Sequence, residues 1–241
     1  LDMKKFMHIG WIVVLICLLG SCEFDELKEP ANVSLKINMV GQEIDGDNDK
    51  KNFNAGKLRI RGGSFVITEI EMDGKRADAE DYYFSHIFEQ TLIADFSDNK
   101  LNQKVNFNFP QGIYDRLKII LHVNKTDTTD GIVLRGKYSM PGLGEKNIEF
   151  CFFNQHEVLE IYAEPASGKS QISLKKGKNK TLEIQLNVKQ IFRYLNPKAL
   201  QNANVTDTEE GEKIIISEQH NTEIFYNLIS RIEKSTRAVI K

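Results

Sequence analysis

The sequence has no large excess of charge of either sign. Lys and Arg together number 32 and Asp and Glu together number 34, which gives a formal net charge of −2 at pH 7. Acidic and basic residues are interspersed along the chain, so no basic field is available to attract nucleic acid. We therefore expect no nucleic-acid partner.

A hydrophobic run long enough to span a membrane is also missing. The apolar run IGWIVVLICLL covers residues 9–19, about eleven residues, whereas a spanning helix needs roughly 20. Lys4 and Lys5 precede the run, and its length falls within the roughly 7–15 residues of a secretory signal. We therefore expect residues 1–21 to be a signal peptide that is removed on export.

The quartet Leu19, Gly20, Ser21 and Cys22 ends this apolar segment and resembles the lipobox of bacterial lipoproteins, in particular envelope lipoproteins of the Bacteroidetes type. The resemblance implies that Cys22 becomes the first mature residue and carries fatty-acid chains such as palmitate. It also implies a tether over residues 22–31 and a protein anchored by lipid in the outer membrane, facing the periplasm or the cell surface.

Cysteine is scarce. Of the three cysteines, Cys17 lies in the expected signal peptide and Cys22 is the expected lipid acceptor, which leaves Cys151 as the lone mature thiol. One thiol cannot form an internal disulfide. Because Cys151 lies within the apolar stretch IEFCFFN, we expect a small buried hydrophobic residue and not a catalytic thiol.

Strict alternation of apolar and polar residues extends from residue 32 to about residue 188. The stretches NVSLKINMV, KVNFNF and TLEIQLNV each place apolar side chains at every second position. A period of two predicts strands with one buried and one solvent-exposed face, which is typical of antiparallel sheets. We predict a mainly β fold, an antiparallel β-sandwich domain over residues 32–241.

The C-terminal part of the sequence, from about residue 188, predicts helical segments. Its last helix is expected over residues 221–235, with Asn221 as N-cap and Ile224, Leu228 and Ile232 on one apolar face. This helix is expected to pack on the sandwich.

The junction FPQGIY, residues 109–114, resembles one found in uncharacterised β-sandwich lipoprotein domains of Bacteroidetes-type envelopes. That resemblance implies a similar β-sandwich fold and no particular chemistry. Pro110 cannot donate to a sheet ladder and should end a strand. In the strand that follows, alternation directs Ile113 and Leu117 to the core and His122 to the opposite face.

No motif in the sequence predicts a catalytic residue, a metal ligand or a cofactor site. His86, His122, His156 and His220 are scattered and lack a ligand spacing such as H-x-x-x-H. The stretch ASGKS lacks the first glycine of a phosphate-binding loop, and DGDNDKKNFNAG lacks the turn glycine and the final glutamate of a calcium loop. Alternation directs Tyr83 to the face opposite that of Tyr82 and Phe84. The preferred interpretation is an aromatic side chain in the sandwich core, and the alternative is an exposed tyrosine that stacks on a sugar or contacts a partner.

Thr128 lies in the tripeptide Asp127-Thr128-Thr129, which resembles the O-glycosylation signal of Bacteroidetes-type envelope proteins. The neighbouring Asp, Thr and Gly residues predict an exposed hairpin loop here, which would present the Thr128 hydroxyl to a glycosyltransferase.

These observations predict a lipid-anchored, non-enzymatic binding or structural module whose partner is an envelope protein or a glycan. Two alternatives stay open. One is an envelope hydrolase whose site forms only in the fold. The other is a metal-binding envelope protein, which requires at least three histidine or carboxylate side chains within coordination distance.

The lipid anchor can be tested directly. We expect Cys22→Ala to abolish incorporation of labelled palmitate and to release the protein from the membrane fraction, because the variant lacks the thiol that is acylated. Labelling of the variant equal to that of the wild type would refute the lipoprotein interpretation.

Overall fold

The computed structural model describes residues 30–45, 56–140, 144–209 and 211–241. The expected signal peptide, Cys22 and nearly all of the calcium-like stretch DGDNDKKNFNAG lie outside the described residues. The first strand begins at Pro30, so the last two residues of the expected tether belong to the folded part.

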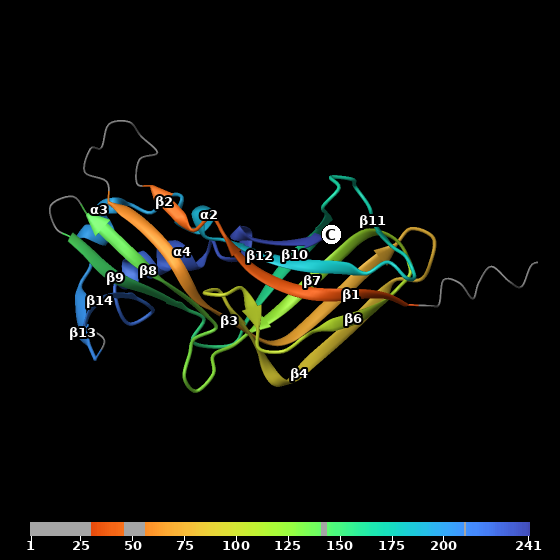
Figure 1. The fold of residues 1–241 in the computed structure, drawn as a ribbon, viewed down its shortest axis with the longest axis horizontal. Coiled ribbons are helices and arrows are strands. Elements are labelled where there is room, and N and C mark those ends of the chain that lie inside the picture. Colours follow the sequence, from red (N-terminus) through yellow and green to blue (C-terminus); the bar gives the residue numbers. More distant parts are fainter. Residues whose placement is uncertain (1–29, 46–55, 141–143, 210) are drawn as a thin grey trace, which may run out of the picture.

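The described residues are mainly strands, which confirms a mainly β fold (Figure 1). The strands, in chain order, are β1 (Pro30–Val40), β2 (Glu43–Asp45), β3 (Lys57–Arg76), β4 (Tyr82–Asp95), β5 (Lys100–Leu101), β6 (Asn106–Pro110), β7 (Gly112–Val123), β8 (Ile132–Met140), β9 (Gly144–Phe152), β10 (Glu157–Pro165), β11 (Ile172–Leu174), β12 (Lys180–Asn187), β13 (Val205–Thr208), β14 (Gly211–Ile216) and β15 (Thr236–Ile240). The helices are α2 (Val188–Phe192), α3 (Pro197–Gln201), α4 (Thr222–Ile229) and the 3-10 turn η2 (Glu233–Ser235).

These strands belong to one large mixed sheet. The main path runs β13-β14-β9-β8-β3-β7-β10-β15-β12-β1-β6, while β2 and β4 pair with β3, β5 pairs with β4, and β11 pairs with β7. Three pairs are parallel, namely β1 with β12, β10 with β15, and β14 with β9. Alternation indicated which face of β1, β6 and β12 is buried, but it predicted antiparallel pairing and did not reveal these parallel neighbours.

The longest strand, β3, has 20 residues and pairs with different strands along its two halves. Its first half pairs with β8 and its second half pairs with β7, both antiparallel. Consequently β7 and β8 follow one another along the same edge of β3, and residues 124–131 connect them without forming the expected hairpin.

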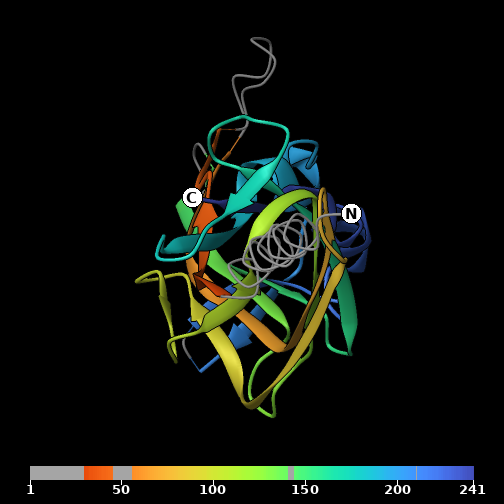
Figure 2. The same ribbon diagram turned by 90° about the vertical axis from the view of Figure 1, so that its right-hand side faces the viewer.

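The sheet curls back on itself so that β4 lies near β6 (Figure 2). Aromatic rings close this contact: Tyr82 packs on Phe109 with 5.8 Å between ring centroids, and Phe84 packs on Phe107 at 5.7 Å. The rings extend the hydrophobic core between two strands that share no backbone ladder.

The junction after β6 follows the sequence-based expectation in part. Pro110 ends β6, and Gly112, with a φ of 147°, begins β7. Ile113 does not face the core as predicted, because it is 41% exposed whereas Tyr114 is fully buried and donates a hydrogen bond to the Pro110 carbonyl. A register shift between β3 and β7 accompanies this change of face.

The C-terminal part is only partly helical. The predicted helix over residues 221–235 ends at Ile229 in α4, and β15 follows it. Asn221 precedes α4 with a left-handed φ of 51° and makes no side-chain cap. Its amide instead donates to the Asn204 and Ile215 carbonyls, which ties α4 to the sheet. In the described parts of the chain, no helix has the length and apolar character that crossing a membrane requires.

One buried carboxylate fixes the junction of β1, β12 and the chain after β15. Glu183 is 7% exposed and accepts hydrogen bonds from Asn38 at 3.0 Å and from Gln185 at 2.8 Å, and it pairs with Lys241. Burial, the largest single influence, raises the pKa of Glu183, but the bonds from Lys241, Gln185 and Asn38 together hold this pKa below its ordinary value.

Because its folded-state pKa is lowered, Glu183 stabilises the fold above its ordinary pKa, and this contribution is lost as the pH falls through the folded-state value. We expect Glu183→Gln to lower the free energy of unfolding at pH 7 by roughly 1.5–3 kcal/mol, the range for hydrogen bonds to charged groups. Chemical denaturation at pH 7 and pH 3 should show the difference shrinking with acidification. The exposed Glu164→Gln serves as control, and an equal effect there would contradict the assignment.

Candidate functional site

Two bulges in β3 decide which of its side chains face solvent. The register with β8 shifts between Ile60 and Gly62, and the registers with β4 and β7 shift between Ile67 and Glu69. A one-residue shift moves every following side chain to the other face of a strand. After the second bulge Ile70 and Met72 are therefore buried, and the carboxylates that alternate with them lie on the outer face.

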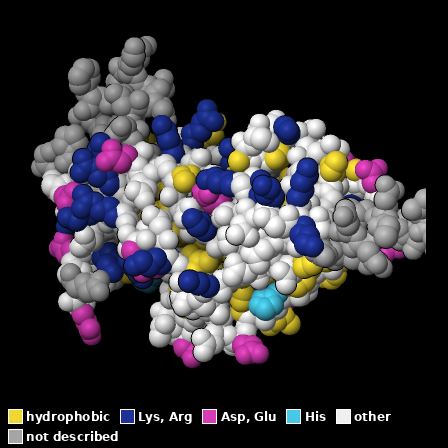
Figure 3. All heavy atoms as spheres, turned by 45° about the vertical axis from the view of Figure 1, so that its right-hand side comes forward, with side chains coloured by type: hydrophobic (Ala, Val, Ile, Leu, Met, Phe, Trp, Pro, Cys, Tyr) yellow, Lys and Arg dark blue, Asp and Glu magenta, His cyan; other side chains and the backbone are white. Residues whose placement is uncertain are grey.

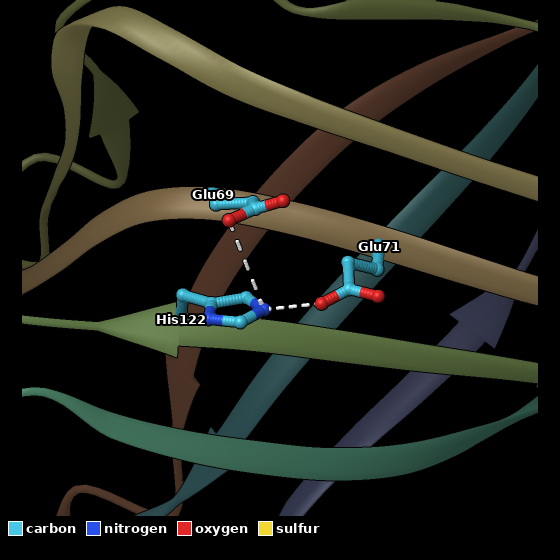
Figure 4. Close-up of side chains that lie close together, drawn as sticks. All are labelled: Glu69, Glu71 and His122. Atoms are coloured by element: carbon cyan, nitrogen blue, oxygen red, sulfur yellow. Dashed lines mark hydrogen bonds and ion pairs between the residues drawn. The ribbon is translucent and has the colours of Figure 1, made fainter.

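The neighbouring strands bring a histidine to these carboxylates. In the antiparallel ladder Glu69 of β3 is paired with His122 of β7, and Glu71 lies one pleat further along the same face. Figure 4 shows the three side chains projecting to the same side of the sheet, with both carboxylates directed at the imidazole ring of His122.

The ligand atoms of Glu69, Glu71 and His122 lie within 4.8 Å of one another. The Nε2 atom of His122 is 2.5 Å from Oε1 of Glu71 and 4.0 Å from Oε2 of Glu69. The three side chains are 17–24% exposed, which leaves them partly shielded but open to solvent on one side. Two carboxylates this close repel each other, so the arrangement favours a bound or neighbouring cation.

Hydroxyl groups from β4 hold the outer carboxylate oxygens. Tyr83 donates to Oε2 of Glu71 at 2.5 Å, and Ser85 donates to Oε1 of Glu69 at 2.5 Å. Each carboxylate therefore keeps its other oxygen directed toward His122. Such hydrogen bonds to the outer oxygen orient the ligands of metal sites.

The same contacts change the acidity of the groups involved. The hydrogen bond from Tyr83 is the largest cause that holds the pKa of Glu71 below its ordinary value, and the hydrogen bond with His122 is the second. The bond to Glu71 is likewise the main cause that raises the pKa of the Tyr83 hydroxyl. Glu71 is therefore an ionised acceptor at neutral pH, and Tyr83 keeps its proton.

A second histidine contacts the far side of the imidazole ring. Nδ1 of His122 lies 3.0 Å from Nε2 of His156, which immediately precedes β10. If Nε2 of His122 carries the proton, it donates to Glu71 and Nδ1 accepts from His156. In the other tautomer Nδ1 donates to His156, and Nε2 presents a lone pair to a metal ion. The pair of histidines can therefore support either protonation pattern.

This geometry suits a divalent transition metal better than Ca²⁺ or Mg²⁺. Imidazole nitrogen is a good ligand for Zn²⁺ and its neighbours in the first transition row, whereas Ca²⁺ and Mg²⁺ prefer oxygen alone. Three protein ligands leave at least one coordination position for water or for a side chain of a partner. Glu69, Glu71 and His122 thus form a candidate binding site for Zn²⁺ or a similar transition-metal ion on the outer face of the sheet.

The other residues singled out in the sequence lie elsewhere. His220 precedes α4 in an exposed loop, and His86 stacks among aromatic rings of β4 and β6. Thr128 is exposed between β7 and β8, where its amide donates to the hydroxyl of Thr126. Tyr83 is 64% exposed and therefore does not lie in the core, which was the preferred interpretation of the sequence. Like His122 and His156, it reaches the cluster, because its hydroxyl bonds Glu71.

Sequence reasoning identified His122 as an outward-facing residue but assigned no metal ligand to the chain. The overlooked signal is the stretch ITEIEM, in which Glu69 and Glu71 alternate with buried Ile70 and Met72. The spacing shows two carboxylates on one wet face, yet the histidine that joins them lies about fifty residues further along the sequence. Only the pairing of β3 with β7 connects them.

Comparisons with protein-family models, with curated proteins and with solved structures found no match for this chain.

Cys151 lies on the outer side of β9 between buried Phe150 and Phe152, and it is half-buried instead of fully buried as expected. Burial is the largest cause that raises the pKa of its thiol well above the ordinary value, and the charges of Glu149 and Asp130 add to it. The thiolate, which is the reactive form, is therefore disfavoured.

We expect Cys151 to react slowly with iodoacetamide at pH 8 in the folded protein and at least about tenfold faster in denaturant, because unfolding removes the burial that suppresses the thiolate. Mass spectrometry of the peptide that contains Cys151 measures both rates. Equal rates would show that the thiol is accessible and ionised in the native strand.

Proposed function

We propose that this chain is a lipid-anchored cell-envelope module that binds a divalent transition-metal ion, of the Zn²⁺ class, on the outer face of its sheet. The observation that carries the proposal is the convergence of Glu69, Glu71 and His122, whose ligand atoms lie within 4.8 Å of one another. A metal-binding protein requires at least three histidine or carboxylate side chains within coordination distance, and this convergence supports such a site.

The supporting contacts favour a built site over three side chains that meet by accident. Tyr83 and Ser85 each bond one carboxylate, and His156 bonds the imidazole of His122. All three ligands therefore have the orienting partners that metal sites use. Binding would displace the hydrogen bond between His122 and Glu71, since a ligating imidazole nitrogen must be unprotonated, and the proton of the neutral imidazole would then lie on Nδ1, which donates to His156.

The proposed role is binding and not catalysis. Metal-dependent enzymes need a shaped, water-poor cavity around the open coordination position. Here the cluster lies on an open strand surface beside exposed Ile87 and Val158, which are paired in the ladders with Glu69 and His122 respectively. Such a surface suits an envelope protein or glycan that contacts the metal from outside.

We further propose that the curled sheet is a β-sandwich, as the sequence predicted. The packing of Phe84 on Phe107, and of Phe109 on Tyr114, supports this interpretation, because these rings join β4 and β7 to β6 across the core. The proposed membrane anchor rests on the lipobox-like quartet that ends at Cys22.

Zinc binding can be measured by isothermal titration calorimetry of the full-length protein in detergent. We expect one Zn²⁺ per chain and at least about 100-fold weaker binding in His122→Ala, because a direct ligand is lost. Tyr83→Phe should weaken binding by roughly 10-fold to 100-fold, since it removes only an orienting hydrogen bond.

His220→Ala is the matched control, because His220 is an exposed histidine far from the cluster in sequence. Zn²⁺ should also raise the melting temperature of the wild type and of His220→Ala but not that of His122→Ala. Unchanged affinity in His122→Ala, or an equal loss in His220→Ala, would overturn the proposal.

A further inference from the structure

Half of one edge of β1 has no backbone partner in the described part of the chain. Along one edge β1 pairs with β12 from Val33 to Val40. Along the other edge it pairs with β6 only from Pro30 to Ser34, and one further bond joins the Leu35 amide to the Val105 carbonyl at 2.9 Å. Beyond Leu35, no backbone hydrogen bond joins β1 to the chain before β6 among the described residues, although β5 lies close to β1.

The bond of Leu35 shows which backbone groups point to this edge. Successive residues of a strand direct their N–H and C=O groups to opposite edges, so Ile37 and Met39 share the edge of Leu35. The side chains of Ile37 and Met39 are 2% and 5% exposed and belong to the core, so only their backbone groups are offered to a partner. An unpaired strand edge of this kind is a template for another strand.

A groove runs beside the unpaired edge. It has a volume of about 650 Å³, and its walls are residues 34–40 of β1 on one side and residues 99–101 and 103–106 on the other. This volume lies within the roughly 300–1,000 Å³ of ordinary ligand pockets. The groove follows the strand direction, so its shape suits an extended segment.

The charged residues of the groove are all basic. Among the residues that the structure describes, Lys36, Lys100 and Lys104 line it, and no Asp or Glu does. Lys100 forms an ion pair with Asp98 at 2.7 Å, whereas Lys36 and Lys104 are exposed and have no acidic partner among the described residues. Figure 3 shows Lys and Arg side chains over the middle of the face that it draws, with hydrophobic side chains visible between them.

We propose that the β1 edge binds an extended acidic peptide segment of another envelope protein, which adds to the sheet as a strand beside Ile37 and Met39. The backbone groups of these two residues hydrogen-bond the peptide, as in other cases of strand addition. Lys36 and Lys104 contact its carboxylates and select acidic sequences. The site is separate from the cluster on β3 and β7 and does not depend on it.

A fluorescein-labelled synthetic peptide of eight residues, with Glu alternating with Val, tests this proposal by fluorescence anisotropy with the full-length protein in detergent. We expect saturable binding that weakens at least about tenfold when alternate peptide amides are N-methylated, because methylation removes the donors that strand pairing needs. Equal binding of both peptides, or no binding of either, would overturn the proposal.

The charge contribution is tested with the double variant Lys36→Glu/Lys104→Glu. Both side chains are exposed, and we expect at least about tenfold weaker peptide binding with Zn²⁺ affinity unchanged. Lys169→Glu/Lys178→Glu, which reverses two exposed lysines in other turns, should bind the peptide as the wild type does. Concentration-dependent dimerisation of the unliganded protein that Lys36→Glu/Lys104→Glu abolishes would assign the edge to a second copy and refute the peptide partner.

Discussion

The hydrogen-bond ladders along β3 are the constraint on which the rest of the sheet depends. One edge of this strand carries β2 and then β4, and the other carries β8 and then β7. The bulge between Ile67 and Glu69 must therefore be accommodated by both neighbours, β4 and β7. The bulge before Glu69 turns that residue outward while Ile70 enters the core, so core packing and the candidate metal centre are set by the same local shift in register.

The two surfaces proposed to bind ligands are built in different ways. The cluster of Glu69, Glu71 and His122 uses side chains in the middle of the sheet, where each backbone is held by neighbours on both sides. The β1 edge uses backbone groups that have no backbone partner among the described residues. The first arrangement gives rigid ligand positions, and the second binds the peptide through its backbone and leaves the selection of acidic sequences to Lys36 and Lys104.

Much of the fold could be predicted from the sequence because alternation depends only on which face of a strand is buried. Val33, Leu35 and Ile37 are buried as predicted, and Pro110 ends β6. The parallel pairs were not predictable, since alternation does not identify the neighbour of a strand. The helix prediction placed the start of α4 correctly after Asn221, although the amide of Asn221 bonds distant carbonyls and not the first turn, but it extended the helix beyond Ile229, where α4 ends.

The candidate site was less predictable than the fold. The outward direction of His122 follows from the alternation of β7, and that of Glu69 and Glu71 from the alternation after the bulge. Their meeting depends on a pairing between strands about fifty residues apart in sequence, which no local pattern encodes. The supporting hydroxyls of Tyr83 and Ser85 come from a third strand.

The place of β15 in the sheet has a kinetic consequence. This strand lies between β10 and β12. Its pairing of Thr236 with Leu186 spans about fifty residues of sequence, and the pairing of β1 with β12 spans almost 150. Proteins dominated by such distant contacts fold slowly, because chain entropy is lost before the contacts form. While the chain is being made, β10 and β12 lack their shared neighbour until residue 240 has emerged, so the nascent protein is most vulnerable to aggregation late in its synthesis.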